Sequence, residues 1–378
     1  MNRMNKDGPG SAMSITSKLA LGAGLALGSY HMLQALLRQS RSFSYENKIA
    51  VVVGGSRGLG LVLARHLLAR GARVAICART AADIDASLRE LRGSGGDVLG
   101  QVCDVRNLDQ IQALVHSALH RWGRIDLLFN VAGIMQVGPL DSMTLADFRT
   151  AMDINCWGPL HTTLAVLPTM RKQGWGRIVN VASIGGKRAV PHMIPYDTSK
   201  FALVGLSTGL RTELAKDGIL VTTVCPSLMR TGSPRNATFK GRHREEYAWF
   251  NIGGSAPIAA VQVDKAARQI LQSCQNGDGE VYITNFFSPP VWASKLAPKL
   301  TTEILAIINR FLPSMGGIGQ QSAYGYESES SASPSILTAL GERAARANNQ
   351  MRPREQDASN SERDSTPLAA TSPIGTLE

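Results

Sequence analysis

The chain has 378 residues, of which 44% are apolar, so it can bury the core of one large domain with appendages or of two ordinary domains. This composition excludes a wholly disordered protein. The formal net charge of +11 favours anionic partners, but Lys and Arg are scattered and form no long basic run, so we predict no nucleic-acid partner. The five cysteines include no CxxC pair, which predicts buried thiols in a reducing, cytoplasmic setting and no metal site.

An apolar stretch, residues 19–37, dominates the N-terminal extension that we place at residues 1–45. Its length suits a membrane span, but three glycines together with His31 and Gln34 lower its hydrophobicity. Basic residues flank both ends, so a membrane span, an interfacial helix and no membrane contact all stay open. A cleaved signal peptide is disfavoured because the polar lead-in before the stretch is long.

Short β-branched runs alternate with longer segments of helical periodicity between residues 46 and 285. This alternation predicts one doubly wound α/β domain, whose seven-stranded parallel sheet is flanked by helices. The strands are expected at Ile49–Val53, Arg73–Ala78, Val98–Cys103, Ile125–Asn130, Arg177–Ala182, Leu220–Cys225 and Glu280–Thr284.

Two appendages follow this domain. Residues 286–315 contain an amphipathic segment that could pack on the core, on a dimer mate or on a membrane. Its apolar face consists of Leu300, Ile304, Ile307, Ile308 and Phe311. Residues 316–378 are rich in small and charged residues and poor in aromatic ones, so we expect a disordered tail apart from a short helix near residues 336–347.

A glycine-rich turn, residues 54–60, joins the first expected strand to the helix that follows it. Backbone amides at the start of a helix can approach a pyrophosphate, and the helix dipole favours its charge. The second strand ends at Arg79 with no carboxylate to repel a 2′-phosphate, and Arg57 in the turn can join Arg79 in binding one. We therefore predict NADP(H) as the cofactor. The turn residues expected to contact it are Gly54, Ser56, Arg57, Gly58, Leu59 and Gly60.

Three residue types that suit carbonyl reduction stand in the second half of the domain. Tyr196 and Lys200 are four residues apart, so they share one face of an expected helix. Ser183 ends the fifth strand, where the carboxyl ends of parallel strands line a ligand crevice. A phenol with a pKa of about 10 needs a nearby cation such as Lys200 to act as an acid and base. Ser183 can donate a hydrogen bond to the substrate oxygen, where charge develops.

Together these motifs resemble the short-chain dehydrogenase/reductase family over residues 46–285, in order and in spacing. The resemblance implies a Rossmann fold and gives Asn155 the role of a fourth active-site residue, which holds a proton-relaying water. It also implies further cofactor contacts at Asp104, Val105, Asn130, Ala132, Gly133, Pro226 and Thr231. The chain departs from the family pattern at Val53, Val131 and Ser227, and Ser227 would be strained if its position needs a positive φ.

Residues 232–257 occupy the place of the family's variable substrate lid. Their aromatic residues, Tyr247, Trp249 and Phe250, either line an apolar pocket or fasten the lid to the core. We expect an NADPH-dependent ketone or aldehyde reductase, or alcohol dehydrogenase, with an apolar or amphipathic small-molecule substrate. The family resemblance implies a homodimer or homotetramer. The alternatives are a non-catalytic NADP-binding scaffold and a membrane-surface redox sensor, the latter anchored through residues 19–37.

Overall fold

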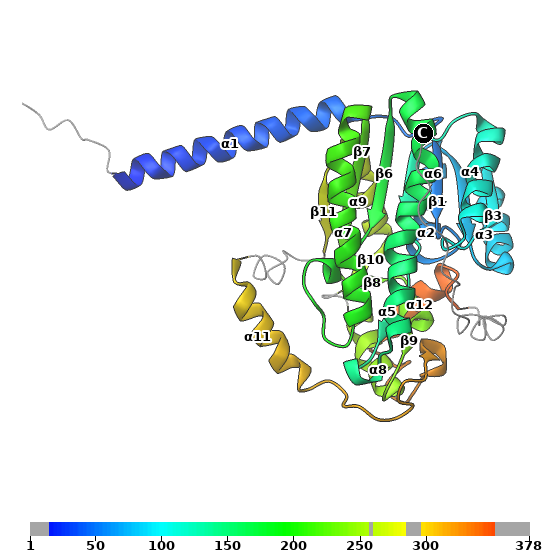
Figure 1. Ribbon diagram of the computed structural model, residues 1–378, viewed down its shortest axis with the longest axis vertical. Helices are drawn as coiled ribbons and strands as arrows, with labels where there is room; N and C mark the ends of the chain where they lie inside the picture. Colours follow the sequence, from blue (N-terminus) through cyan, green and yellow to red (C-terminus); the bar gives the residue numbers. More distant parts are fainter. Residues whose placement is uncertain (1–14, 257–259, 285–295, 352–378) are drawn as a thin grey trace, which may run out of the picture.

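A parallel sheet of seven strands forms the centre of the computed structural model, which describes residues 15–256, 260–284 and 296–351 (Figure 1). Its strand order is β11-β7-β6-β4-β1-β2-β3. The strands are β1 (Ile49–Val53), β2 (Arg73–Ala78), β3 (Val98–Val102), β4 (Leu127–Asn130), β6 (Gly176–Val181), β7 (Ile219–Pro226) and β11 (Glu280–Ile283). The predicted fold class is confirmed, and the expected strands differ from the observed ones only at their ends.

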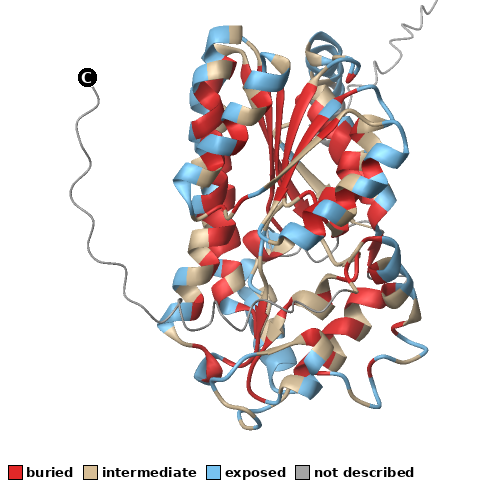
Figure 2. Ribbon diagram, turned by 90° about the vertical axis from the view of Figure 1, so that its right-hand side faces the viewer, coloured by how far each residue is buried: buried red, intermediate tan, exposed pale blue. Residues whose placement is uncertain are grey.

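The sheet is buried on both faces because helices cover each of them (Figure 2). Successive side chains of β1 point to opposite faces. Ala50 and Val52 pack with α2 (Gly58–Leu68), α3 (Ala81–Gly93) and α9 (Val263–Asn276). Val51 and Val53 pack with α4 (Leu108–Trp122), α6 (Gly158–Gln173) and α7 (Ile194–Leu214). Continuous apolar runs such as residues 49–53 are therefore typical of a strand covered twice.

The direction of the strand order reverses at β1, which pairs with β2 on one side and with β4 on the other. In open α/β sheets a crevice forms at such a switch point, beyond the carboxyl ends of the strands. A second feature is a local change of helix geometry. The helix α5 (Leu145–Met152) continues through a π-helical turn, Asp153–Trp157, into α6, and this turn holds Asn155 in a fully buried position.

The lid lies below the carboxyl ends of the strands and contains the helix α8 (His243–Ser255). It also contributes β9 (Thr238–Phe239) to a three-stranded sheet with β5 (Gln136–Val137) and β12 (Ala323–Tyr324). The ring of Phe239 lies 5.3 Å from that of Tyr247 and 6.0 Å from that of Phe250, measured between centroids. This buried aromatic cluster gives the lid a small core of its own. Beside it, β8 (Met229–Arg230) pairs with β10 (Val261–Gln262).

The C-terminal residues fold onto this lid, so the expected disorder of residues 316–378 is wrong for residues 316–351. Within them, β12 extends the lid sheet and the helix α12 (Ala339–Ala347) packs against α8 and β8. The helix lies inside the stretch where a short one was predicted. Small residues permit the close packing: Ser328, Ser333 and Thr338 are buried, and the Asn251 side chain donates a hydrogen bond to Ser333 Oγ at 2.9 Å. The rest of the predicted tail, residues 352–378, lies outside the described part.

Two helices project from this body. The apolar stretch of residues 19–37 lies in α1 (Ile15–Arg41), which extends away from the domain (Figure 1). Among the residues that the structure describes, no helix combines the length and the apolar character needed to traverse a bilayer. The predicted amphipathic segment forms α11 (Pro298–Asn309), and its apolar residues Leu300, Ile304, Ile307 and Ile308 are exposed. Of the three alternatives left open for this segment, packing on the core of this chain is therefore not observed.

The five cysteines are buried free thiols, as predicted.

Candidate active site

One cavity of about 410 Å³ lies at the carboxyl ends of the central strands, and it brings together residues from distant parts of the chain. Its volume is within the ordinary range for a small-molecule site. The predicted site residues that line it are Gly54, Ser56, Arg57, Gly58, Leu59, Gly60, Arg79, Asp104, Val105, Ala132, Gly133, Ser183, Tyr196, Lys200, Pro226 and Thr231. Asn130 and Asn155 do not line the cavity, because both side chains are buried behind its wall.

The glycine turn forms one end of the cavity because only glycine fits at its key positions. Gly54 adopts a φ of +83°, and a Cβ there would lie 2.7 Å from the backbone nitrogen of Ala132. A Cβ on Gly60 would lie 2.0 Å from the carbonyl oxygen of Gly54. The close approach sets the start of α2 against the end of β1. Within the described residues, the amides of Leu59 and Gly60 have no hydrogen-bond partner, so the positive end of α2 presents two donors.

The charged residues beyond the turn line the same cavity. Arg57 and Arg79 both reach it, and Arg57 Nη1 donates a hydrogen bond to Asn236 Oδ1 at 2.9 Å. Asp104 is bound by Arg106, whose Nη2 lies 2.8 Å from Asp104 Oδ2. Burial raises the pKa of Asp104, but the hydrogen bonds and the charge of Arg106 outweigh it, so the pKa is lowered overall. Asp104 is thus a charged acceptor in the cavity, and its contact with adenine, which the family resemblance implies, stays a prediction.

The predicted catalytic side chains converge at the other end. Ser183 follows β6, and its Oγ accepts a hydrogen bond from the amide of Gly185 at 3.0 Å. Tyr196 and Lys200 stand in the first turns of α7, which begins with Pro195 near its N-terminus. Lys200 Nζ lies 5.7 Å from the centroid of the Tyr196 ring and donates a hydrogen bond to the Val181 carbonyl at 3.0 Å. Ser183, Tyr196 and Lys200 therefore share one wall of the cavity.

Burial dominates the protonation of both groups on α7. It raises the pKa of Tyr196 to about 12, although the hydrogen bond with Ser183 lowers it in part. Burial also lowers the pKa of Lys200 to about 8, against the opposing effect of Cys156 and Cys225. Lys200 was expected to bring the pKa of Tyr196 down. In the protein chain alone desolvation of the phenol dominates, and the effect of Lys200 on Tyr196 stays a prediction.

Asn155 lies behind the cavity wall and ties its parts together. Its Oδ1 accepts a hydrogen bond from the Ile134 amide at 2.9 Å, and its Nδ2 donates to Ser199 Oγ at 2.9 Å and to the Ile134 carbonyl at 3.1 Å. Gly133 separates it from the ammonium: a Cβ on Gly133 would lie 3.0 Å from Asn155 Oδ1 and 3.5 Å from Lys200 Nζ. A π-helical turn often marks a functional site. The water-holding role of Asn155 stays a prediction.

Asn130 also sits behind the wall, which corrects its expected contact with the cofactor. Its Nδ2 donates to Asn180 Oδ1 at 2.8 Å, and its Oδ1 accepts from Thr162 Oγ1 at 2.7 Å. It therefore joins β4 to β6 and α6, and it steadies the sheet beneath Ala132 and Gly133. Ser227 shows no strain either, because it is absent from the described non-glycine residues with a positive φ, which are Asn47, His192 and Asn349.

Two aromatic residues of the lid, Trp249 and Phe250 of α8, contribute to the lining of the cavity. Tyr247, by contrast, is fully buried in the lid core. Tyr247 is therefore confined to the lid core, whereas Trp249 and Phe250 line the cavity and also pack in or against that core. Glu246 fixes α8 to the loop before α7, because its Oε1 lies 2.7 Å from Nδ1 of the buried His192 and its Oε2 accepts from Trp249 Nε1 at 2.7 Å.

Three charged or amide side chains that were not predicted as site residues also line the cavity: Arg188, Asn236 and Gln350. Arg188 stands in the loop after Ser183, and within the described residues its buried Nε has no hydrogen-bond partner. Burial lowers the pKa of its guanidinium, and Asp197 opposes this. The only sequence signal for Arg188 is that a basic residue follows Ser183 five positions later in the chain. The other two residues come from the lid and from the C-terminal extension, and no motif marks them.

The doubly wound sheet places a glycine turn at one end of the cavity and Ser183, Tyr196 and Lys200 at the other. This arrangement defines a nicotinamide-dependent oxidoreductase acting on carbonyl or alcohol groups. Residues 48–240 match the family of short chain dehydrogenases, and the chain belongs to this family. Enzymes of this family act on small-molecule substrates.

Two relatives and one solved structure illustrate the similarity. A putative ketoacyl reductase of Streptomyces coelicolor is 39% identical over 234 residues, which cover 60% of this chain and 89% of the relative. A 3-oxoacyl-[acyl-carrier-protein] reductase of Synechocystis is 33% identical, over 50% of this chain and 77% of that protein. The crystal structure of a short-chain dehydrogenase from Streptomyces avermitilis superposes with a TM-score of 0.57 and 26% identity, covering 70% of this chain and 97% of that one.

Proposed function

We propose that the chain is an NADPH-dependent reductase of a ketone or aldehyde, which runs as an alcohol dehydrogenase in the opposite direction, with Tyr196 as the proton donor and acceptor. The observation that carries the proposal is that one cavity joins the glycine turn, Arg57 and Arg79 to the wall formed by Ser183, Tyr196 and Lys200. NADPH, when bound, supplies the hydride.

The residues at the glycine end fit a dinucleotide phosphate. Two backbone donors at the start of α2 suit a pyrophosphate, and only glycine leaves room for the approach at Gly54 and Gly60. β2 ends without a carboxylate at the place where NAD-preferring folds of this kind carry one. Arg57 and Arg79 stand there instead, and guanidinium groups bind phosphate through charge-assisted hydrogen bonds. These features support NADPH over NADH.

The chain's own residues handle the proton. Tyr196 stays protonated across the neutral range because burial raises its pKa to about 12, so its hydroxyl can donate to the oxygen of a carbonyl that receives hydride. Ser183 donates a hydrogen bond to the same oxygen and stabilises its developing charge. Lys200, held by the Val181 carbonyl, carries its charge below a pH of about 8 and favours the phenolate that remains.

The substrate that suits the cavity is amphipathic. Apolar side chains on the lid side, Met193, Trp249 and Phe250, can contact an acyl or ring body. The Arg188 guanidinium lines the same region and can bind an anionic or carbonyl oxygen of the substrate. The two relatives described above carry the names of ketoacyl reductases. We infer a 3-ketoacyl compound, or a ketone of similar shape, as the substrate of this chain.

The test compares Tyr196→Phe with wild type in an assay of NADPH oxidation, using a panel of 3-ketoacyl thioesters and cyclic ketones. Loss of the phenolic proton donor should lower kcat by about 10²- to 10⁴-fold while the Kd for NADPH changes little. Tyr30→Phe is a matched control, because Tyr30 lies exposed on α1. Full activity of Tyr196→Phe would refute the mechanism. A wild-type protein that binds NADPH but reduces no carbonyl compound would favour the scaffold alternative.

A further inference from the structure

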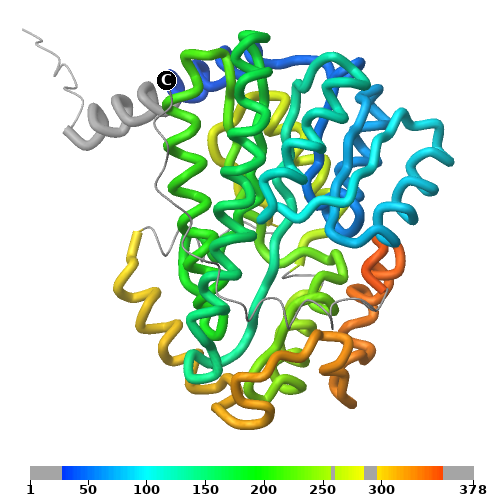
Figure 3. Tube along the Cα trace, turned by 45° about the vertical axis from the view of Figure 1, so that its right-hand side comes forward, coloured from blue at the N-terminus to red at the C-terminus, as the bar shows by residue number. Residues whose placement is uncertain are grey.

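The last described residues of the chain reach back to the cofactor end of the cavity. Residues 339–350, which we name the clasp, comprise α12 and the three residues after it. The clasp lies outside the residues that match the family. It nevertheless runs beside the glycine turn, as the neighbouring red and blue segments show (Figure 3). Gln350, at its end, lines the cavity.

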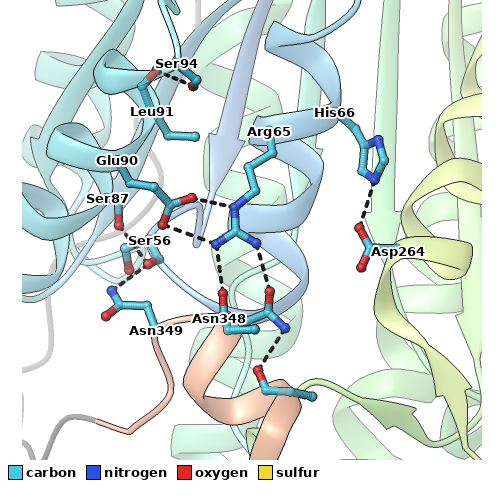
Figure 4. Close-up of polar contacts among 12 residues, drawn as sticks. Ser56, Arg65, His66, Ser87, Glu90, Leu91, Ser94, Asp264, Asn348 and Asn349 are labelled. Carbon is cyan, nitrogen blue, oxygen red and sulfur yellow. Dashed lines mark hydrogen bonds and ion pairs between the residues drawn. The ribbon is translucent and has the colours of Figure 1, made fainter.

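Polar contacts hold the clasp to the glycine turn and α2 (Figure 4). The Gly58 amide donates a hydrogen bond to the Asn348 carbonyl at 2.8 Å. Arg65 Nη1 donates to Asn348 Oδ1, and Arg65 Nη2 donates to the Ala347 carbonyl, both at 2.9 Å. Asn349 Nδ2 donates to the Ser56 carbonyl at 3.0 Å. Because these bonds reach backbone atoms of the turn itself, the clasp has a defined position relative to the start of α2.

The other side of the clasp is joined to the lid. Ala345 is fully buried and leaves no room for a side chain at Gly232, where a Cβ would lie 2.4 Å from the Cβ of Ala345. Glu342 lies 3.4 Å from Arg235 of the lid. The Asn236 side chain donates to the Gln350 carbonyl at 3.2 Å and to its Oε1 at 2.6 Å. The clasp therefore links the lid to the phosphate end of the cavity.

A relay of hydrogen bonds fixes which end of the Gln350 amide faces the turn. Arg57 can only donate, so the Asn236 oxygen must accept from it, and the Asn236 nitrogen is left to donate. That nitrogen requires an acceptor on Gln350, which is Oε1. Gln350 Nε2 consequently points to the turn and lies 2.5 Å from the place that a Cβ on Gly58 would occupy. Gln350 is 7% exposed, and its Nε2 has no hydrogen-bond partner within the described residues.

We propose that Gln350 is a cofactor-binding residue, whose Nε2 donates a hydrogen bond to the pyrophosphate of the dinucleotide next to the amides of Leu59 and Gly60. The inference rests on the proposed dinucleotide function of the cavity. A fixed donor beside the positive end of a helix suits an anion, because hydrogen bonds to charged acceptors are the stronger ones. The pyrophosphate is common to both nicotinamide cofactors. The contribution of Gln350 is therefore the same for NADPH and for NADH, unlike that of Arg79.

The test measures the Kd of NADPH and of NADH for the full chain by isothermal titration calorimetry. Gln350→Ala removes the donor and should raise both Kd values by a similar factor of about ten. Gln350→Glu still accepts from Asn236 but turns a negative charge to the phosphate, so its effect should exceed that of Gln350→Ala. Gln350→Lys restores a donor and should bind both nucleotides more tightly than Gln350→Ala. If Gln350 had only a structural role, the Kd values would not depend on whether the substituted side chain is negative or positive.

The control is Gln321→Ala, an exposed residue of the same extension, which should leave both Kd values unchanged. Melting temperatures of all variants establish that they fold. The inference is overturned if the Gln350 variants bind both nucleotides as wild type does. A chain that ends at Thr338 lacks the clasp and is measured in the same way. The inference is also overturned if this chain or the Gln350 variants bind the nucleotides more tightly than wild type. The clasp would then block the site, because its Asn348 carbonyl would compete with phosphate for the amides of the turn. A wild-type protein that binds neither nucleotide would instead refute the proposed function.

Discussion

Lys200 Nζ lies 5.7 Å from the centroid of the Tyr196 ring, one helical turn further along α7. Burial acts on the two groups in opposite directions, so the pKa of Lys200 falls to about 8 while that of Tyr196 rises to about 12. Lysine therefore loses its proton first as the pH rises. Below a pH of about 8 the pair consists of a neutral phenol and an ammonium ion, which is the combination that carbonyl reduction requires.

The rate of reduction should consequently fall on the alkaline side. We expect kcat/KM for NADPH-dependent reduction to be flat up to a pH of about 7 and to decrease as the pH rises through about 8, where Lys200 becomes neutral. The measurement is a pH profile of initial rates, because kcat/KM reports the groups of the free enzyme. Lys200→Arg keeps its charge at every pH tested and should lose this alkaline decrease. The same decrease in that variant would mean that another group titrates.

Asp197, next to Tyr196, should make the stability of the fold depend on pH. Its Oδ2 accepts a hydrogen bond from the Val190 amide at 2.6 Å, and its Oδ1 is buried without a partner in the described residues. Burial raises its pKa from 3.8 to about 8, although the Val190 hydrogen bond and Arg188 oppose the shift. The folded state thus holds a proton that the unfolded state releases. The resulting stabilisation is complete below a pH of about 4 and is lost as the pH rises to about 8.

Asp197→Asn keeps an acceptor for Val190 and cannot ionise. Between these limits the free energy of unfolding of wild type should fall by up to about 1.4 kcal/mol per pH unit relative to that of Asp197→Asn. Urea unfolding at pH 5, 6, 7 and 8 measures the difference. Asp85→Asn, on the exposed face of α3, is the control, and its free energy of unfolding should depend on pH as that of wild type does. A constant gap between Asp197→Asn and wild type across this range would show that Asp197 is ionised in the folded protein.

The sequence could predict those parts of the molecule that depend on local pattern. The apolar run of β1, the glycine turn and the spacing of Tyr196 and Lys200 each act within a few residues, and all take the places expected for them. The exact ends of the strands were harder to predict. β4 begins at Leu127 and not at Ile125, for instance, because pairing with its neighbours sets the limits of a strand.

The C-terminal clasp could not be predicted, because its interactions are polar and distant in sequence. Asn236 and Gln350 are 114 residues apart, and no periodicity connects them. Small residues of the C-terminal extension, such as Ser333 and Ala345, are buried, whereas a composition rich in Ser and Ala is typical of disorder. The tertiary contacts with the lid override that local preference. For the same reason the sequence does not show the place of Asn155, whose partners Ile134 and Ser199 lie 21 and 44 residues away in the chain.

Arg79 should decide the choice between the two nicotinamide cofactors. It lines the cavity at the end of β2, and only NADPH carries a 2′-phosphate that it can bind. Arg79→Ala should raise the Kd of NADPH by about ten- to a hundredfold and leave that of NADH nearly unchanged. Fluorescence titration with each nucleotide gives both values. Arg89→Ala, exposed on α3, serves as the matched control. Equal affinities of wild type for the two nucleotides would contradict the predicted preference.

Gly60 should be indispensable both for folding and for nucleotide binding. A Cβ at this position would lie 2.0 Å from the Gly54 oxygen and 2.8 Å from the Gly54 carbonyl carbon, and these backbone atoms cannot swing aside. Gly60→Ala must therefore push the first turn of α2 away from β1, at a cost of about 1–3 kcal/mol in unfolding free energy, and displace the Leu59 amide.

The matched control is Gly93→Ala at the exposed end of α3, where an added Cβ meets nothing within 4 Å and φ is not positive. This substitution should leave the Kd of NADPH unchanged and stabilise the fold by about 0.5–1 kcal/mol, because alanine restricts the unfolded chain. Thermal unfolding measures the stability of the two variants, and NADPH titration measures their Kd. If Gly60→Ala matched Gly93→Ala in both measurements, the glycine turn would not need its close contact with α2, and the phosphate site would have to be sought elsewhere.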